Sequence, residues 1–110
     1  MYMTLNEMAA MCDSAAKNKG WGLTPLPFSE VIANIQAEVS EAWEEYRDGH
    51  KPDETYWRGT KPEGIPTELA DVLIRVFHAA GHYGIDLDTA FGNKMVYNRT
   101  RSKRHGGKRA

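Results

Sequence analysis

The sequence predicts an all-α fold, a four-helix-bundle-like domain of antiparallel helices. Apolar residues recur at three- and four-residue spacing in four segments of the 110-residue chain, which is typical of amphipathic helices. Sustained alternation of apolar and polar residues is absent, as are Asn-Gly and Asp-Gly turns, so strands are not expected. The length fits one domain, residues 1–110. Since so short a chain covers its apolar stripes poorly, homo-oligomerisation is expected to complete the bundle.

The first helix is expected over about residues 4–18, inside an N-terminal helix and linker of residues 1–28. Glycines and prolines between residues 20 and 27 break it. A longer helix should begin at Ser29, an expected N-cap, and run to about residue 48, where Gly49 ends it. Its inward positions follow 3,4,3,4 spacing, the mark of one buried seam: Ile32, Ile35, Val39, Ala42 and Tyr46.

The third helix is expected over residues 66–82, with Pro66 at its start and Gly81 and Gly84 at its end. The preceding segment, 50–64, is rich in proline and glycine and reads as a loop. A fourth helix should follow from Asp86 or Asp88 to about residue 101, and residues 102–110 form a basic tail. The inward positions of the third helix are Leu69, Val72, Leu73, Val76 and Ala80.

Composition places the chain in the cytoplasm. Cys12 is the only cysteine, so an internal disulfide is excluded, in agreement with a reducing compartment. The first residues lack a signal-peptide pattern, and no apolar stretch approaches the roughly 20 residues that cross a bilayer, so no membrane role is expected. With a net charge of −1, a nucleic-acid partner is not expected either, although half of the fourteen cations fall within the last seventeen residues.

Two helices carry the same pair of acids. Glu38 and Glu41 lie on one face of the second helix, and Glu68 and Asp71 repeat that spacing on the third, at the same phase to the apolar seam. If the helices pack antiparallel through their seams, four carboxylates converge and need a cation. Oxygen ligands select magnesium, manganese or calcium. A single such pair is more often a solvated helix face; the repeated pair favours a metal site.

A di-iron centre is set aside. In helical bundles that chemistry usually needs a histidine three residues after a glutamate on two helices. No histidine of this chain stands in that position.

A basic stripe is expected on the fourth helix. Lys94, Asn98, Arg101 and, if the helix continues, His105 fall on one side of it. Arginine can chelate two phosphate oxygens and lysine supplies a point charge, so the stripe suits a polyphosphate. A basic last turn that complements the helix dipole explains Lys94 and Arg101 equally well when they are taken alone.

Four aromatic residues outside the seams could stack on a base: Trp21, Trp43, Tyr56 and Trp57. At its helical phase Trp43 is more often a core residue. Trp57 lies in the loop 50–64, which is either a lid or a loop that packs its own aromatic residues.

These motifs resemble the MazG-like branch of the all-α nucleoside triphosphate pyrophosphohydrolases. Glu38-x-x-Glu41, twenty-six residues, and Glu68-Leu-Ala-Asp71 resemble its acidic motif; Lys94-x-x-x-Asn98-x-x-Arg101, followed by His105-Gly-Gly-Lys108, resembles its C-terminal motif. The resemblance spans about residues 30–108. Many relatives carry glutamate at position 37, where this chain has Ala37, and proline at position 102, where it has Ser102.

The resemblance implies a helical bundle that is dimeric or tetrameric, with Mg²⁺ held by the four acids and the nucleotide near Lys94, Asn98 and Arg101. Trp43, Trp57 and His105 complete the expected substrate site. The expected activity is Mg²⁺-dependent hydrolysis of nucleoside triphosphates, with Mn²⁺ as a substitute, to a nucleoside monophosphate and pyrophosphate. Phosphoribosyl-ATP hydrolysis and a non-catalytic helical bundle that binds nucleotides or dimerises remain alternatives.

Overall fold

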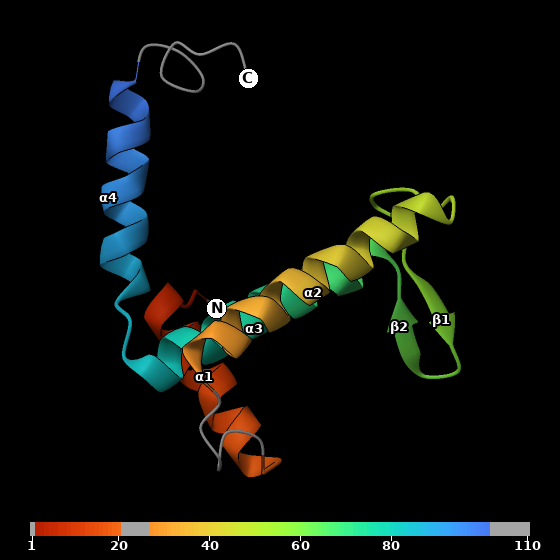
Figure 1. Cartoon of the computed structure of the whole chain (residues 1–110), viewed down its shortest axis with the longest axis horizontal. Coiled ribbons are helices and arrows are strands. Elements are labelled where there is room, and N and C mark those ends of the chain that lie inside the picture. Colours follow the sequence, from red (N-terminus) through yellow and green to blue (C-terminus); the bar gives the residue numbers. More distant parts are fainter. Residues whose placement is uncertain (1, 21–26, 102–110) are drawn as a thin grey trace.

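The computed structural model describes residues 2–20 and 27–101. Four helices and one hairpin follow one another along the chain (Figure 1). In order they are α1 (Leu5–Asn18), α2 (Phe28–Arg47), β1 (Tyr56–Arg58), β2 (Lys61–Glu63), α3 (Ile65–Tyr83) and α4 (Leu87–Thr100). The prediction of an all-α fold is confirmed in its main part, and each predicted helix begins and ends within a few residues of the observed one.

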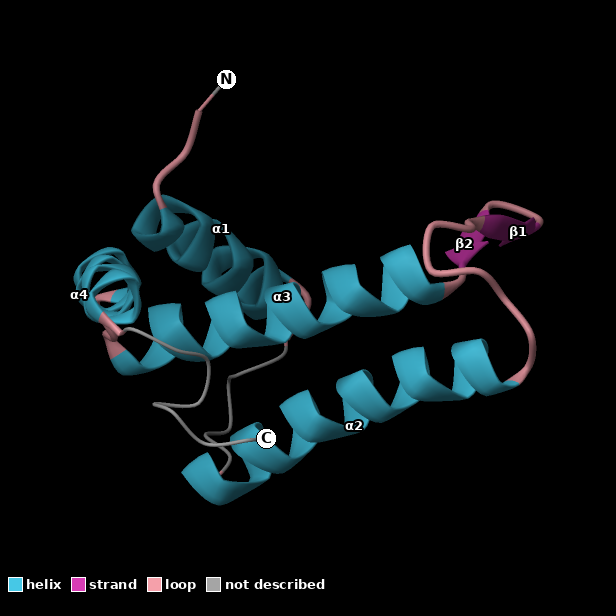
Figure 2. Cartoon of the chain, turned by 90° about the horizontal axis from the view of Figure 1, so that it is seen from above, coloured by secondary structure: helices cyan, strands magenta, loops and turns pink. Residues whose placement is uncertain are grey.

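The centre of the molecule is an antiparallel pair of helices, α2 and α3, which run side by side (Figures 1 and 2). α1 packs across the C-terminal half of α3, and α4 projects from the same end (Figure 1). The β1–β2 hairpin stands at the opposite end of the pair. The four helices of one chain therefore do not form a closed bundle.

The prediction of a loop for residues 50–64 is wrong in part. β1 and β2 pair antiparallel with Tyr56 opposite Glu63 and Arg58 opposite Lys61. The strands have three residues each and β2 contains Pro62, which is too little for an alternating pattern. Gly59, with φ of +61°, makes the turn that a side chain would strain.

Two helix boundaries differ from the expectation. Ser29 is not the N-cap, because α2 already begins at Phe28 after Pro27 and no side chain caps it. Gly81 does not end α3, which continues to Tyr83 and stops at Gly84 in the left-handed region, φ +66°. Pro66 lies in the first turn of α3, as predicted.

The start of α4 is tied to the start of α1. The Asp86 carboxylate caps α4 by accepting from the Thr89 backbone N–H at 3.1 Å and also accepts from the Asn6 amide at 2.9 Å; hydrogen bonds from Asn6 and Thr89 lower the pKa of Asp86 to about 2. Asp88 in turn accepts from the Leu5 backbone N–H at 2.9 Å. These bonds fix the direction in which α4 projects.

The predicted burial of the apolar seams of α2 and α3 is wrong in part for the single chain. α2 buries Glu38 and Ala42, whereas Val39 is 51% and Tyr46 is 57% exposed. On α3, Leu73 is 55% exposed. Three of the five seam residues of α2 and two of the five seam residues of α3 are exposed, so a part of each apolar seam faces outward. The other exposed seam residues are Ile32 and Leu69.

Small residues allow α1 and α3 to cross closely. Ala9 and Ala80 are each 3% exposed, and a Cβ added to Gly81 would lie 2.5 Å from the carbonyl oxygen of Ala9 and 2.8 Å from Cβ of Asp13. The nearest atom belongs to the backbone of α1, which cannot easily move away from an added side chain.

Gly81→Ala is therefore expected to destabilise the protein by about 1–3 kcal/mol, because overpacking outweighs the gain in helix propensity. Gly92→Ala in α4 is the matched control: nothing lies within 4 Å of its added Cβ, so the same change should stabilise by up to about 1 kcal/mol. Chemical denaturation followed by circular dichroism measures both. Equal stability changes in the two variants would contradict the close crossing.

Among the described helices, none is both long enough and apolar enough to cross a membrane.

Candidate metal centre

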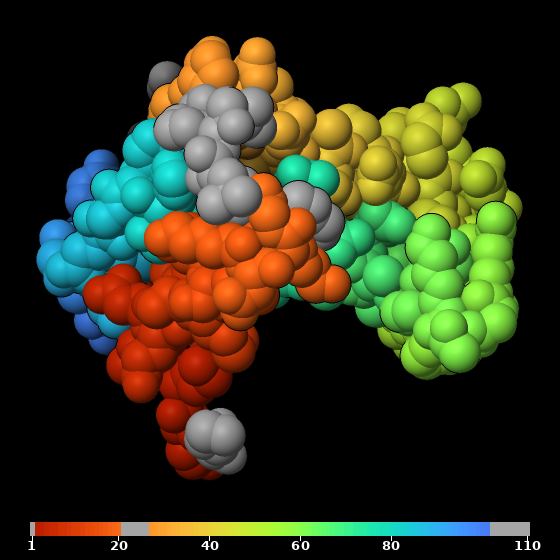
Figure 3. Space-filling model, turned by 90° about the horizontal axis from the view of Figure 1, so that it is seen from below, coloured from red at the N-terminus to blue at the C-terminus, as the bar shows by residue number. Residues whose placement is uncertain are grey.

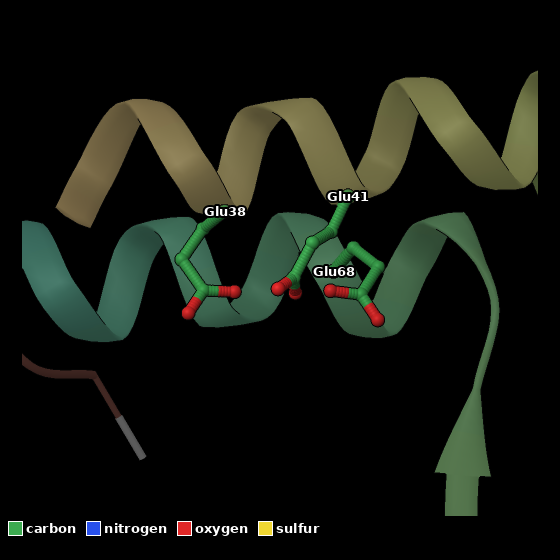
Figure 4. Close-up of side chains that lie close together, drawn as sticks. All are labelled: Glu38, Glu41 and Glu68. Carbon is green, nitrogen blue, oxygen red and sulfur yellow. The ribbon is translucent and has the colours of Figure 1, made fainter. Parts of the chain in front are cut away.

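Three carboxylates meet between α2 and α3. Glu38 and Glu41 extend from α2 towards Glu68 of α3 (Figure 4). One oxygen from each of the three lies within 4.8 Å of the others. The three-residue spacing places Glu38 and Glu41 on one helical face, and the antiparallel packing of α3 brings Glu68 opposite them. The expected convergence of acids is present for these three.

Two oxygens of this cluster are buried and lack hydrogen-bond partners. Glu38 is 8% exposed, and its Oε2, like Oε2 of Glu68, has no partner. The other oxygen of Glu38, Oε1, accepts from Nε of Arg75 at 2.6 Å. Buried carboxylate oxygens without partners cost free energy, so these two are candidate ligand atoms for a cation.

The electrostatics of the cluster favour added positive charge. Burial, together with the neighbouring Glu41 carboxylate, raises the pKa of Glu68 from 4.5 to about 7. Burial also raises the pKa of Asp71, with the Glu38 charge adding to the effect while Arg75 opposes it. Carboxylates that resist ionisation in this way gain most from a bound divalent ion.

Asp71 lies beside this cluster. It is not one of the three acids whose carboxylate oxygens lie within 4.8 Å of one another. Asp71 instead lines a cleft together with Glu38, and the Glu38 charge contributes to the raised pKa of Asp71. It is positioned to contact an ion or a ligand from the cleft side.

A second acidic group shares Glu68 with the first. It consists of Glu45, Glu63 and Glu68. Both oxygens of Glu45 accept from the Tyr56 hydroxyl at 3.0 Å, and Glu63 has Lys61 Nζ at 3.3 Å. Because local donors already satisfy two of its members, this group has less need of a cation than the first.

A cleft of about 990 Å³ opens beside the acids. α1, α2 and α3 all contribute to it, with Glu38 and Asp71 on one side and apolar or uncharged residues such as Met11, Val31 and Ile74 elsewhere. Figure 3 shows the surface from the side of α1, with α1 and the hairpin at the two ends of this face. Ligand pockets typically measure about 300–1,000 Å³, so a nucleotide-sized molecule fits beside the carboxylates.

The predicted basic stripe does not reach the acids within one chain. Lys94, Asn98 and Arg101 lie on or directly after α4, which projects away from α2 (Figure 1). Lys94 Nζ is 5.0 Å from the ring centre of Tyr97, and the Arg101 guanidinium is 5.7 Å from it. His105 lies outside the described residues.

The predicted stacking residues also lie away from the cleft. Trp43 is 58% exposed, not a core residue, and stacks with Tyr46. Trp57 of β1 is 62% exposed, and neither tryptophan lines the cleft. Trp21 lies outside the described residues. The hydroxyl of Tyr56 is occupied by Glu45.

Sequence reasoning missed Arg75. Its spacing from Asp71, four residues, places the two side chains one turn apart on α3, and that spacing was a usable signal. An arginine on an amphipathic helix is so often a surface residue, however, that only the fold singles it out.

The comparisons with known proteins add no relative. No family model matches the chain, and neither a curated protein nor a solved structure matches it.

Proposed function

We propose that the chain is a Mg²⁺-dependent hydrolase that splits nucleoside triphosphates into a nucleoside monophosphate and pyrophosphate. The observation that carries the proposal is the cluster of Glu38, Glu41 and Glu68, with its two unpartnered buried oxygens, at the edge of a nucleotide-sized cleft. The MazG-like motifs of the sequence point to the same chemistry. A single cysteine, Cys12, allows no internal disulfide, which is consistent with a proposed location in the reducing cytoplasm.

The residues present suit a hard divalent cation. The donor set is made of carboxylate oxygens alone, which favours Mg²⁺ or Mn²⁺ over softer metals. Glu38, Glu41 and Glu68 would hold the ion, and Asp71 would contribute from the cleft side. Burial and the neighbouring Glu41 carboxylate raise the pKa of Glu68 to about 7, which supports a site where added positive charge is favourable.

Each group has a defined task in this hydrolysis. Glu38, Glu41 and Glu68 would hold the Mg²⁺ ion, which would supply positive charge at the phosphates and make water more acidic. The cleft holds the nucleoside so that the α-phosphorus lies near the acids, and a carboxylate of the cluster takes the proton that the attacking water loses. The bond between the α-phosphorus and the oxygen that bridges it to the β-phosphate breaks, and pyrophosphate leaves with that oxygen. No protein nucleophile is required.

The active form in this proposal is a homodimer or homotetramer. One chain leaves an outward apolar face on α2 and α3, and every residue of α4 from Thr89 to Thr100 is exposed, including Phe91 at 58%. The radius of gyration, 16.5 Å, exceeds the about 13 Å expected for a compact domain of this length. A second copy would cover these surfaces. It would also bring Lys94, Asn98 and Arg101, which stand away from the acids of their own chain, towards those of its neighbour.

The proposal is tested by a panel of ribo- and deoxyribonucleoside triphosphates, with pyrophosphate release measured with and without Mg²⁺. Release should require Mg²⁺, and Glu41→Gln should lower kcat/KM about a hundredfold or more by removing a metal ligand. Glu44→Gln, on the same helix, is the matched control: among the described residues Glu44 forms its ion pair with Arg47, at the surface, so activity should not change.

The other outcomes separate the alternatives. Mg²⁺-dependent nucleotide binding without pyrophosphate release would indicate a non-catalytic bundle. Hydrolysis of phosphoribosyl-ATP in place of simple triphosphates, identified from the products, would indicate the related activity. Full activity in Glu41→Gln would contradict the proposed metal role.

A further inference from the structure

Arg75 makes the closest charged contact of the acidic cluster. Its Nε donates to Oε1 of Glu38 at 2.6 Å, a short, charge-assisted bond. The carboxylate side chain is 11% exposed, whereas the arginine side chain is 48% exposed. The acid is thus held in place between the helices, and the arginine reaches it from the cleft, which both residues line.

Within the described part of the chain, the other cation near the cluster, Lys61, forms an ion pair with a different acid. Lys61 opposes part of the rise in the pKa of Asp71 that burial and the Glu38 charge cause, but its own ion pair, at 3.3 Å, is with Glu63. Among the described residues, Arg75 is the one cation that forms an ion pair with Glu38. Its guanidinium therefore supplies the positive charge that Glu38 needs in the absence of metal.

We propose that Arg75 is an exchangeable counter-ion, which holds Glu38 in the metal-free chain and releases Oε1 when a divalent cation binds. The inference rests on the metal site of the proposed function and not on the reaction. Once released, the guanidinium stands in the cleft and binds an anionic group of the ligand there.

Charge and mobility both support the exchange. A divalent ion and a guanidinium on one carboxylate repel each other, and coordination by Oε1 competes with a 2.6 Å hydrogen bond for the same oxygen. Glu38 cannot move away because it is buried between α2 and α3. Arg75 can, since its half-exposed side chain has a flexible stem that reaches into open cleft.

The test is titration of Mn²⁺ alone, without nucleotide, into the full chain, followed by calorimetry. Arg75→Met removes the charge but keeps much of the apolar stem, and it should bind Mn²⁺ about fivefold more tightly than the unaltered protein because no internal cation competes. Arg75→Lys keeps the charge but loses the several N–H donors of the guanidinium, so its Mn²⁺ affinity should lie between those of Arg75→Met and the unaltered protein. Arg47→Met is the matched control, since the ion pair of Arg47 in the described part of the chain is with the exposed Glu44, and it should leave Mn²⁺ affinity unchanged.

Thermal unfolding provides a second readout. In EDTA, Arg75→Met should have a lower Tm than the unaltered protein because Glu38 loses its partner, and saturating Mn²⁺ should raise its Tm by more. If Arg75→Met does not fold, the comparison rests on Arg75→Lys, which should still bind Mn²⁺ more tightly than the unaltered protein. Unchanged or weaker Mn²⁺ binding in the folded Arg75 variants would overturn the exchange and leave the metal site standing. Absence of Mn²⁺ binding to the unaltered protein would overturn both.

Discussion

Glu68→Gln is expected to stabilise the metal-free protein at pH 8 while it removes Mn²⁺ binding. The pKa of Glu68 is about 7 in the folded chain against an ordinary value of 4.5. Between these values the folded state binds more protons than the unfolded state, so the free energy of unfolding falls as pH rises. Above about pH 7 the destabilisation by the buried charge is complete. Glutamine, uncharged at every pH, avoids it.

The measurement is Tm in EDTA at pH 5 and pH 8. Glu68→Gln should have the higher Tm at pH 8, and the difference from the unaltered protein should shrink towards pH 5, where Glu68 is mostly protonated in the folded state. Glu44→Gln controls for the general effect of removing a surface charge. A Glu68→Gln variant with a lower Tm than the unaltered protein at pH 8, or with the same Tm difference at both pH values, would show that the pKa of Glu68 is not raised in the folded protein.

Leu73→Asp is expected to break the proposed homo-oligomer into single chains. Leu73 of α3 is 55% exposed and lies about 140° around the helix from Glu68, away from the carboxylates. On α2, Val39 is also exposed and lies about 100° from Glu38. The two helices thus share an apolar face opposite the acids, which suits a second copy of the same face.

A charge buried at the centre of such an interface should weaken association roughly a hundredfold or more. Sedimentation equilibrium over a range of protein concentrations measures this, with Asn18→Asp at the exposed end of α1 as the control. If Leu73→Asp sediments like the unaltered protein, the apolar face of α2 and α3 is not the subunit contact. An unaltered protein that is monomeric at every concentration would contradict self-association itself.

The helices were predictable because their apolar periodicity is strong. α2 carries the 3,4,3,4 pattern, α3 carries apolar residues at three- and four-residue spacing, and Pro66 and Gly84 mark the two ends of α3. The hairpin was not predictable, since strands of three residues are too short for an alternating pattern and β2 contains Pro62. Periodicity also identifies an apolar seam without naming its partner. Val39 and Leu73 were therefore assigned to a core that one chain does not form.

The acidic cluster was predictable to a similar extent. The spacing of Glu38 and Glu41 fixes their common face, and the antiparallel partner brings Glu68 to them. Sequence spacing could not show that Glu38 would be buried or that Asp71 would lie outside the group of three acids, because those positions depend on how closely the helices pack. The bond from Arg75 to Glu38 joins residues thirty-seven positions apart and needed the fold itself.

The central claim is that Glu38, Glu41 and Glu68 form a binding site for a hard divalent cation. Calorimetric titration of Mn²⁺ into the metal-free protein tests it most directly, with Glu41→Gln and the surface control Glu44→Gln titrated in parallel. The account predicts saturable binding that Glu44→Gln retains and Glu41→Gln loses. Binding that persists in Glu41→Gln, or that is absent from the unaltered protein, would contradict it.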